Sequence, residues 1–265
     1  MIERVEAIWS DLEKIRLSIP LVGYMSGFGV MNNLSNMLLA VGAAPKAILC
    51  EEEAEDTVPV CSAMFLTSEM ARGAYLDQFQ KIMPKAKESG VPFVFDPAGV
   101  SGSVFRSDIC MKLLSDGRPT VIKGNAAEIM ALRALFIPQD DSSPAEDELS
   151  EYAFLRAAHQ LSHFFECVVV VSGLKSHVVY QDEESQVMNG SMLMLRNADT
   201  SAFASALCAT FAAVNPNPYE ACINAMFVLG IAAEIGEQDS DGPGTYLPRF
   251  LDALANMAKY QLLLK

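Results

Sequence analysis

The order of the predicted secondary-structure elements constrains the fold of this chain more than any other feature. Short apolar runs of strand length alternate with longer segments in which apolar residues recur every three or four positions. The predicted strands are residues 47–50, 62–66, 91–95, 119–123 and 168–171, and the predicted helices are residues 2–17, 34–41, 71–89, 106–114, 126–135, 151–165 and most of 201–264. Because strands joined through helices pair in parallel, with helices on both faces, we expect a three-layer α/β/α fold with a mostly parallel central sheet.

Two segments interrupt this alternation. Residues 177–180 and 187–188 are apolar and flank the acidic run Asp182-Glu183-Glu184, which predicts a β-hairpin. Residues 138–148 are acidic and polar with two prolines, which predicts a surface loop that is too short to link two domains. A length of 265 residues suits one large α/β unit, so we expect a single domain over residues 1–265.

Composition excludes several classes of partner. Apolar residues make up 51% of the chain, which is enough for a sizeable core. The formal net charge of −14 argues against binding to nucleic acids or to anionic membranes, because both carry phosphate groups. No uninterrupted apolar run approaches the roughly 18 residues of a membrane span, and no secretory leader is evident. The six cysteines form no CxxC pair, which favours reduced, buried thiols and a cytoplasmic location.

Two acidic residues follow predicted strands at the edge where ligands gather in such folds. Asp96 comes directly after an apolar strand and precedes a turn that contains Gly99, and Glu128 lies in the first turn of the helix after the next strand. Two such carboxylates can share a Mg²⁺ ion that positions the phosphates of a nucleotide. The alternatives are a turn-forming Asp before Pro97 and a Glu that complements the helix dipole.

Other polar residues near these turns also have two interpretations each. Asn125 caps the following helix or faces a ligand, and Lys123 binds phosphate or ends a strand. Asp199 precedes a helix of small residues, where a helix cap is a stronger interpretation than a phosphate site. The chain has no GxGxxG or GxxxxGK[ST] motif, and its three histidines show no zinc-binding spacing.

Several spaced motifs resemble those of the hydroxyethylthiazole kinase family, a member of the ribokinase-like superfamily. The run LLAVGAAP at residues 38–45 resembles the family's LLAxGAxP, and DPAG at 96–99 with Phe105-Arg106 resembles its DPVGxGAxxFR. The run GNAAEI at 124–129 matches its GNxxEI without a change. Asn189-Gly190 and GPGTY at 242–246 resemble two later motifs, so the resemblance extends over almost the whole chain.

The resemblance implies a ribokinase-like fold and a homotrimer. It implies phosphorylation of the hydroxyl of 4-methyl-5-(2-hydroxyethyl)thiazole, or of a related small alcohol, with ATP and Mg²⁺ in thiamine salvage. The residues it implies are Asp96 and Glu128 for the metal, Lys123, Asn125, Glu128 and Gly173 for the nucleotide, and Asn32, Asn36, Pro45 and Ala47 for the thiazole, which would lie between subunits. Lys123 stands where the family usually has Arg.

The chain departs from the family most clearly at residues 198–202. The family has a TGxGC sequence there, with an anion hole and a catalytic cysteine, whereas this chain has ADTSA with Ala202 at the cysteine position. Gly27-Phe28 replaces two asparagines, and Thr67-Ser68-Glu69-Met70 replaces the family's NxGT turn. One hypothesis is an active kinase in which Asp199 accepts the proton of the alcohol. The alternatives are a weakened relative that binds nucleotide or a small ligand without efficient phosphoryl transfer, and a plain interaction domain.

Overall fold

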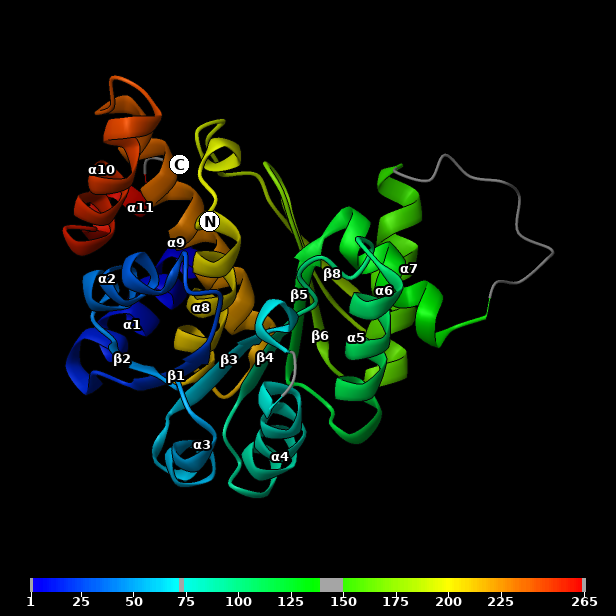
Figure 1. The fold of residues 1–265 in the computed structure, drawn as a ribbon. Coiled ribbons are helices and arrows are strands. Elements are labelled where there is room, and N and C mark those ends of the chain that lie inside the picture. The colour runs from blue at the N-terminus through cyan, green and yellow to red at the C-terminus, as the bar shows by residue number, and fades with distance from the viewer. Residues whose placement is uncertain (1, 72–73, 139–149, 264–265) are drawn as a thin grey trace.

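A computed structural model describes residues 2–71, 74–138 and 150–263 of the chain (Figure 1). The described residues form one eight-stranded sheet in the order β2-β1-β3-β4-β5-β6-β7-β8. Its strands are β1 (Leu21–Met25), β2 (Ala44–Ala47), β3 (Ala63–Thr67), β4 (Phe93–Asp96), β5 (Val121–Asn125), β6 (Val168–Ser172), β7 (Ser176–Tyr180) and β8 (Glu183–Val187). The pairs from β2 through β6 are parallel, and β7 and β8 add antiparallel strands at one edge, so the expected mostly parallel sheet is confirmed.

Helices cover both faces of the sheet, as Figure 1 shows. One face carries α1 (Ile2–Ser18), α2 (Met31–Val41), α8 (Thr200–Ala212), α9 (Pro218–Gln238), α10 (Pro243–Ala255) and α11 (Lys259–Leu263), and the other carries α3 (Glu51–Thr57), α4 (Ala74–Glu88), α5 (Val104–Asp116), α6 (Ala126–Phe136) and α7 (Glu151–Phe165). Successive strand residues alternate between the two cores, as Val94 and Phe95 of β4 do. The three-layer α/β/α prediction is therefore confirmed.

The first two strands differ from the sequence prediction. Strand β1 was not predicted, although four of its five residues are buried. The predicted strand at 47–50 is wrong, because the chain is extended at Ala44–Ala47, where it pairs with β1 from Leu21↔Ala44 to Tyr24↔Ala47. β2 is an edge strand, and an edge position tolerates Pro45, which cannot donate a backbone hydrogen bond. Pairing in the sheet, rather than local apolarity, decides this register.

Three further expectations have definite outcomes. The hairpin is confirmed, but Glu183 and Glu184 lie in β8 and not in the turn. The predicted loop at 138–148 falls mostly outside the described residues. The cysteines are free, and five are buried as expected, whereas Cys50 is exposed. Among the described residues, α9 is long and apolar enough to cross a membrane, but 78% of its apolar window is buried in the core.

The topology brings three strand ends together beneath one helix. β3, β4 and β5 are adjacent and parallel, and the register places Thr67 beside Asp96. Helix α8 packs against all three of these strands, with Ser201 in its first turn. The carboxyl ends of the strands therefore face the start of α8, which is the region where ligands bind in open α/β sheets.

Candidate functional site

A cavity of about 400 Å³ opens where these strand ends meet α8. It is lined by Ser26, Val30, Phe65, Thr67, Glu69, Asp96, Ala98, Gly99, Arg106, Asn125, Glu128, Ala198, Ser201 and Ala202. The two carboxylates predicted from the sequence as metal ligands thus face the same space. The cavity also contains the position of the family's cysteine, Ala202.

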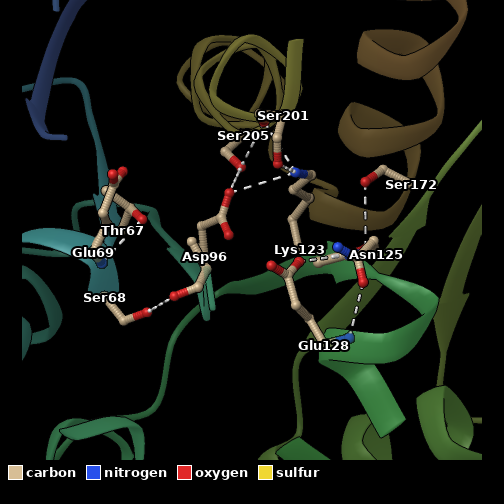
Figure 2. A network of polar contacts seen from close by, with 12 residues as sticks. Thr67, Ser68, Glu69, Asp96, Lys123, Asn125, Glu128, Ser172, Ser201 and Ser205 are labelled. Atoms are coloured by element: carbon tan, nitrogen blue, oxygen red, sulfur yellow. Dashed lines mark hydrogen bonds and ion pairs between the residues drawn. The ribbon is translucent and has the colours of Figure 1, made fainter. Parts of the chain in front are cut away.

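Asp96 lines this cavity and has one carboxylate oxygen without a hydrogen-bond partner among the described residues. The residue is 2% exposed and ends β4. Its Oδ2 accepts a hydrogen bond of 2.8 Å from Ser205 Oγ and lies 3.4 Å from Lys123 Nζ (Figure 2). Its Oδ1 is buried and has no hydrogen-bond partner among the described residues. Because a buried charged oxygen without a partner is costly, this atom points to a missing ligand.

Lys123 lies below the cavity and is fully buried. Besides Asp96, its Nζ contacts Ser201 Oγ at 2.5 Å and Ser201 O at 3.0 Å. It therefore joins β5 to the start of α8, as Figure 2 shows, and it is not among the residues that line the cavity. Its assignment to nucleotide binding stays a prediction, and its visible contacts position Asp96 and Ser201.

Asn125 and Glu128 form a capping box that starts α6. Asn125 Oδ1 accepts a bond of 2.9 Å from Glu128 N, and Glu128 Oε2 accepts one of 2.9 Å from Asn125 N. Glu128 Oε1 also accepts a bond of 3.1 Å from Gly99 N. Gly99 has φ +73°, which favours glycine in this turn. The capping interpretation of Asn125 is therefore confirmed, and both side chains also line the cavity, whereas ligand binding by them stays a prediction.

Burial raises the pKa of Glu128 above its ordinary value, and the nearby charge of Asp96 raises it further. The hydrogen bonds from Asn125 and Gly99 act in the opposite direction, as does Lys123. A cation near both carboxylates would offset the unfavourable effect of Asp96 on the charge of Glu128.

The residues of this cavity fit a magnesium ion. Mg²⁺ prefers carboxylate oxygens and keeps water and phosphate oxygens as further ligands. Asp96 Oδ1 and the Glu128 carboxylate supply such oxygens. No group of three or more acidic, histidine or cysteine side chains arranged for a metal occurs in the described part of the chain. The protein would thus provide one or two ligands and leave the others to phosphate and water.

Asp199 does not behave as the sequence suggested. It occupies the cap position of α8, but its side chain makes no capping hydrogen bond, so the cap interpretation is wrong. Instead, Asp199 Oδ2 accepts a bond of 2.6 Å from Asn33 Nδ2 of α2. The residue is 8% exposed and is not among those that line the cavity. Its proposed role as a base stays a prediction.

The predicted thiazole-binding residues lie away from this cavity. Asn32 and Asn36 are exposed on α2, one helical turn apart, and Pro45 and Ala47 are half-buried on the edge strand β2 beside it. Because α2 packs against β2, these four residues belong to neighbouring elements. Gly173 is exposed at the end of β6, next to the end of β5, where Ser172 pairs with Asn125.

The structure adds residues that sequence analysis missed. Ser26 follows the unpredicted strand β1, is 3% exposed, and its Oγ has no hydrogen-bond partner among the described residues. Ser205 lies one helical turn after Ser201 and holds Asp96. Arg106, which the sequence analysis named only as part of a motif, donates from Nη1 to the carbonyls of Ser68 and Glu69 at 2.7 and 2.8 Å. The sequence pattern that could have identified Ser26 is a small polar residue directly after a strand end.

Comparisons with known proteins find relatives that match almost the whole chain. The family model described as "Hydroxyethylthiazole kinase family" matches residues 12–260. A hydroxyethylthiazole kinase from Leptospira biflexa is 34% identical over 249 residues, which cover 92% of this chain and 90% of the relative. A solved structure of a hydroxyethylthiazole kinase protein from Pyrococcus horikoshii has a TM-score of 0.88 and 29% identity, covering 100% of this chain and 97% of the other. A ribokinase-like superfamily protein from Enterococcus faecalis shares the fold, with a TM-score of 0.69 at 12% identity, covering 95% and 94% of the two chains.

Proposed function

Because the chain belongs to the hydroxyethylthiazole kinase family, we propose that it transfers the γ-phosphoryl group of ATP to the hydroxyl of 4-methyl-5-(2-hydroxyethyl)thiazole, as a step of thiamine salvage. The family match spans almost the whole chain, and both acidic residues of the metal side are present. This favours the kinase over the weakened relative and the interaction domain. The chain acts as a single domain in this proposal.

The observation that carries the proposal is the free Oδ1 of Asp96 in a cavity at the strand ends. Asp96 and Glu128 would hold Mg²⁺, which would neutralise the phosphates of ATP. Asn125 and Glu128 fix the start of α6, while Gly173 on the neighbouring strand end supports the nucleotide. Lys123 would position the metal ligand Asp96 through its contact with Asp96 Oδ2.

The thiazole would bind on a surface formed by α2 and β2, the neighbouring elements that carry Asn32, Asn36, Pro45 and Ala47. In the single chain this surface includes the exposed apolar side chain of Leu39, 59% exposed on the same helix. In this proposal a second copy of the chain covers Leu39 and completes the thiazole site. We therefore propose a homotrimer that works in the cytoplasm on a small-molecule alcohol.

The test is an assay of the purified protein with ATP, Mg²⁺ and the thiazole alcohol, with the phosphorylated product measured by mass spectrometry. We expect stoichiometric ADP and thiazole phosphate, lost when Mg²⁺ is removed with a chelator. Nucleotide binding without any thiazole phosphate at high protein concentration would instead favour the weakened relative. If the protein instead phosphorylates another small alcohol in the same assay, the assignment as a kinase stands and the proposed substrate is wrong.

A further inference from the structure

Ser201 occupies a position where its hydroxyl can meet a ligand. It lies in the first turn of α8, is exposed, and lines the cavity opposite Asp96 and Glu128. In the resemblance described above, a glycine stands at this position. The serine thus adds a hydroxyl to the wall of the cavity where the family has none.

A count of protons fixes the direction of the hydrogen bond between Ser201 and Lys123. The ammonium of Lys123 has three protons and three acceptors, namely Ser201 Oγ at 2.5 Å, Ser201 O at 3.0 Å and Asp96 Oδ2 at 3.4 Å (Figure 2). Ser201 Oγ is therefore an acceptor toward Lys123. Its own proton is left for another acceptor, and none of the described residues accepts it.

The charges around the cavity make such a donor valuable. Three carboxylates line it, those of Glu69, Asp96 and Glu128, against the single guanidinium of Arg106, which is bonded to backbone carbonyls. An incoming phosphoryl group adds further negative charge. Lys123 is a further cation beside the cavity, but its ammonium is fully buried and contacts the cavity wall through Ser201 and, at a longer distance, through Asp96.

We infer that the Ser201 hydroxyl donates a hydrogen bond to the phosphoryl group that is transferred, and that Lys123 is the positioning residue that orients and polarises this hydroxyl. The inference rests on the proposed function and deepens it. The unpartnered Asp96 Oδ1 in the same cavity is an independent sign that a ligand belongs there. The hydroxyl of Ser201 then does part of the work for which the family uses a glycine backbone at this position.

The test compares Ser201→Ala, Ser201→Gly and Ser201→Thr, with Ser115→Ala at the far end of α5 as a matched serine control. The first readout is the ratio of affinities for the ATP analogue AMP-PNP and for ADP, measured by calorimetry with Mg²⁺, because this ratio isolates the γ-phosphate. The second is kcat with the thiazole alcohol. We expect Ser201→Ala and Ser201→Gly to lower the affinity ratio about tenfold and kcat roughly 10²-fold, with partial recovery in Ser201→Thr.

Lys123 is tested through Ser201. Lys123→Arg is made alone and in the Ser201→Ala background. We expect Lys123→Arg to lower the affinity ratio in the first case and to change it little in the second, because its effect passes through the hydroxyl. An equal loss in both backgrounds would overturn the positioning role.

The outcomes separate the two proposals. An unchanged ratio and kcat in Ser201→Ala, or a rise in kcat in Ser201→Gly, would overturn the inference while the kinase activity stands. The wild type could make no thiazole phosphate while the affinity ratio still falls tenfold in Ser201→Ala. That result would support the inference and refute the proposed substrate. Failure of the wild type to bind AMP-PNP would overturn both.

Discussion

The two walls of the cavity differ in how closely they keep the family pattern. On the wall formed by the strand ends, Asp96 and Glu128 match the expected motifs, and each is held by at least two contacts. On the wall formed by the start of α8, Ser201 and Ala202 stand where a glycine and a cysteine are expected. The strand-end wall, which we propose binds the metal, thus keeps the expected residues, whereas the α8 wall, which we propose meets the transferred group, differs from them.

The largest effect is expected from Asp96→Asn, which alters the retained wall. It removes a proposed metal ligand, and we expect kcat to fall roughly 10²–10³-fold. It also leaves the buried charge of Lys123 without its carboxylate, so the free energy of unfolding should fall by about 3 kcal/mol. Denaturant titration and the product assay measure the two losses separately.

The double variant Asp96→Asn/Lys123→Met sharpens this result. Removing both charges should restore much of the stability, because no unpaired buried charge is left. Activity should stay low, because the charged carboxylate for the metal is still absent. Recovery of activity together with stability would mean that Asp96 has only a structural role.

Ala202→Cys tests the changed wall by adding the side chain that the family has at this cavity position. If the α8 wall lacks a group that accepts the alcohol's proton, we expect kcat to rise by about tenfold or more, within the range of general-base catalysis. The rise should follow the ionisation of the added thiol in a pH–rate profile. Ala202→Ser is the control of similar size, and an equal gain from it would point to packing instead of proton transfer.

Asp199→Asn tests whether Asp199, at the start of α8, is the base that accepts the alcohol's proton. The carboxylate is tied to Asn33 and does not line the cavity, so we expect kcat to stay within about threefold. The lost charge-assisted bond should lower the free energy of unfolding by about 1 kcal/mol. A loss of 10²-fold or more in kcat, at unchanged stability, would establish Asp199 as the base.

The smallest effect is expected from Glu69→Gln at the edge of the cavity. Glu69 is exposed, so its repulsion of the ATP phosphates is screened by water and salt. We expect the affinity for Mg²⁺-ATP to rise about twofold at low ionic strength and the gain to disappear at high salt. An affinity that falls instead would show that Glu69 contributes to metal binding.

Most of the fold could be predicted because its signals are local. Helical periodicity and the apolar runs at β3 to β6 located most elements, and the motif at 124–129 located the capping box of α6. β1 and β2 were missed or misplaced because the extended conformation of Ala44–Ala47 depends on its pairing with β1. That pairing has no signature within the segment itself.

The sequence alone determined that two carboxylates follow neighbouring parallel strands. Strand order and turn residues can be predicted from short segments, because both depend on local sequence patterns. The tertiary structure alone decided what surrounds them. Lys123 bonds to Ser201, which lies 78 residues later in the sequence, and Asn33 bonds to Asp199, which lies 166 residues later. Neither contact can therefore be predicted from the spacing of nearby residues. Such contacts arise when helices α2 and α8 pack onto one face of the sheet, and they leave Ser201 at the cavity wall while Asp199 is bonded to Asn33 outside it.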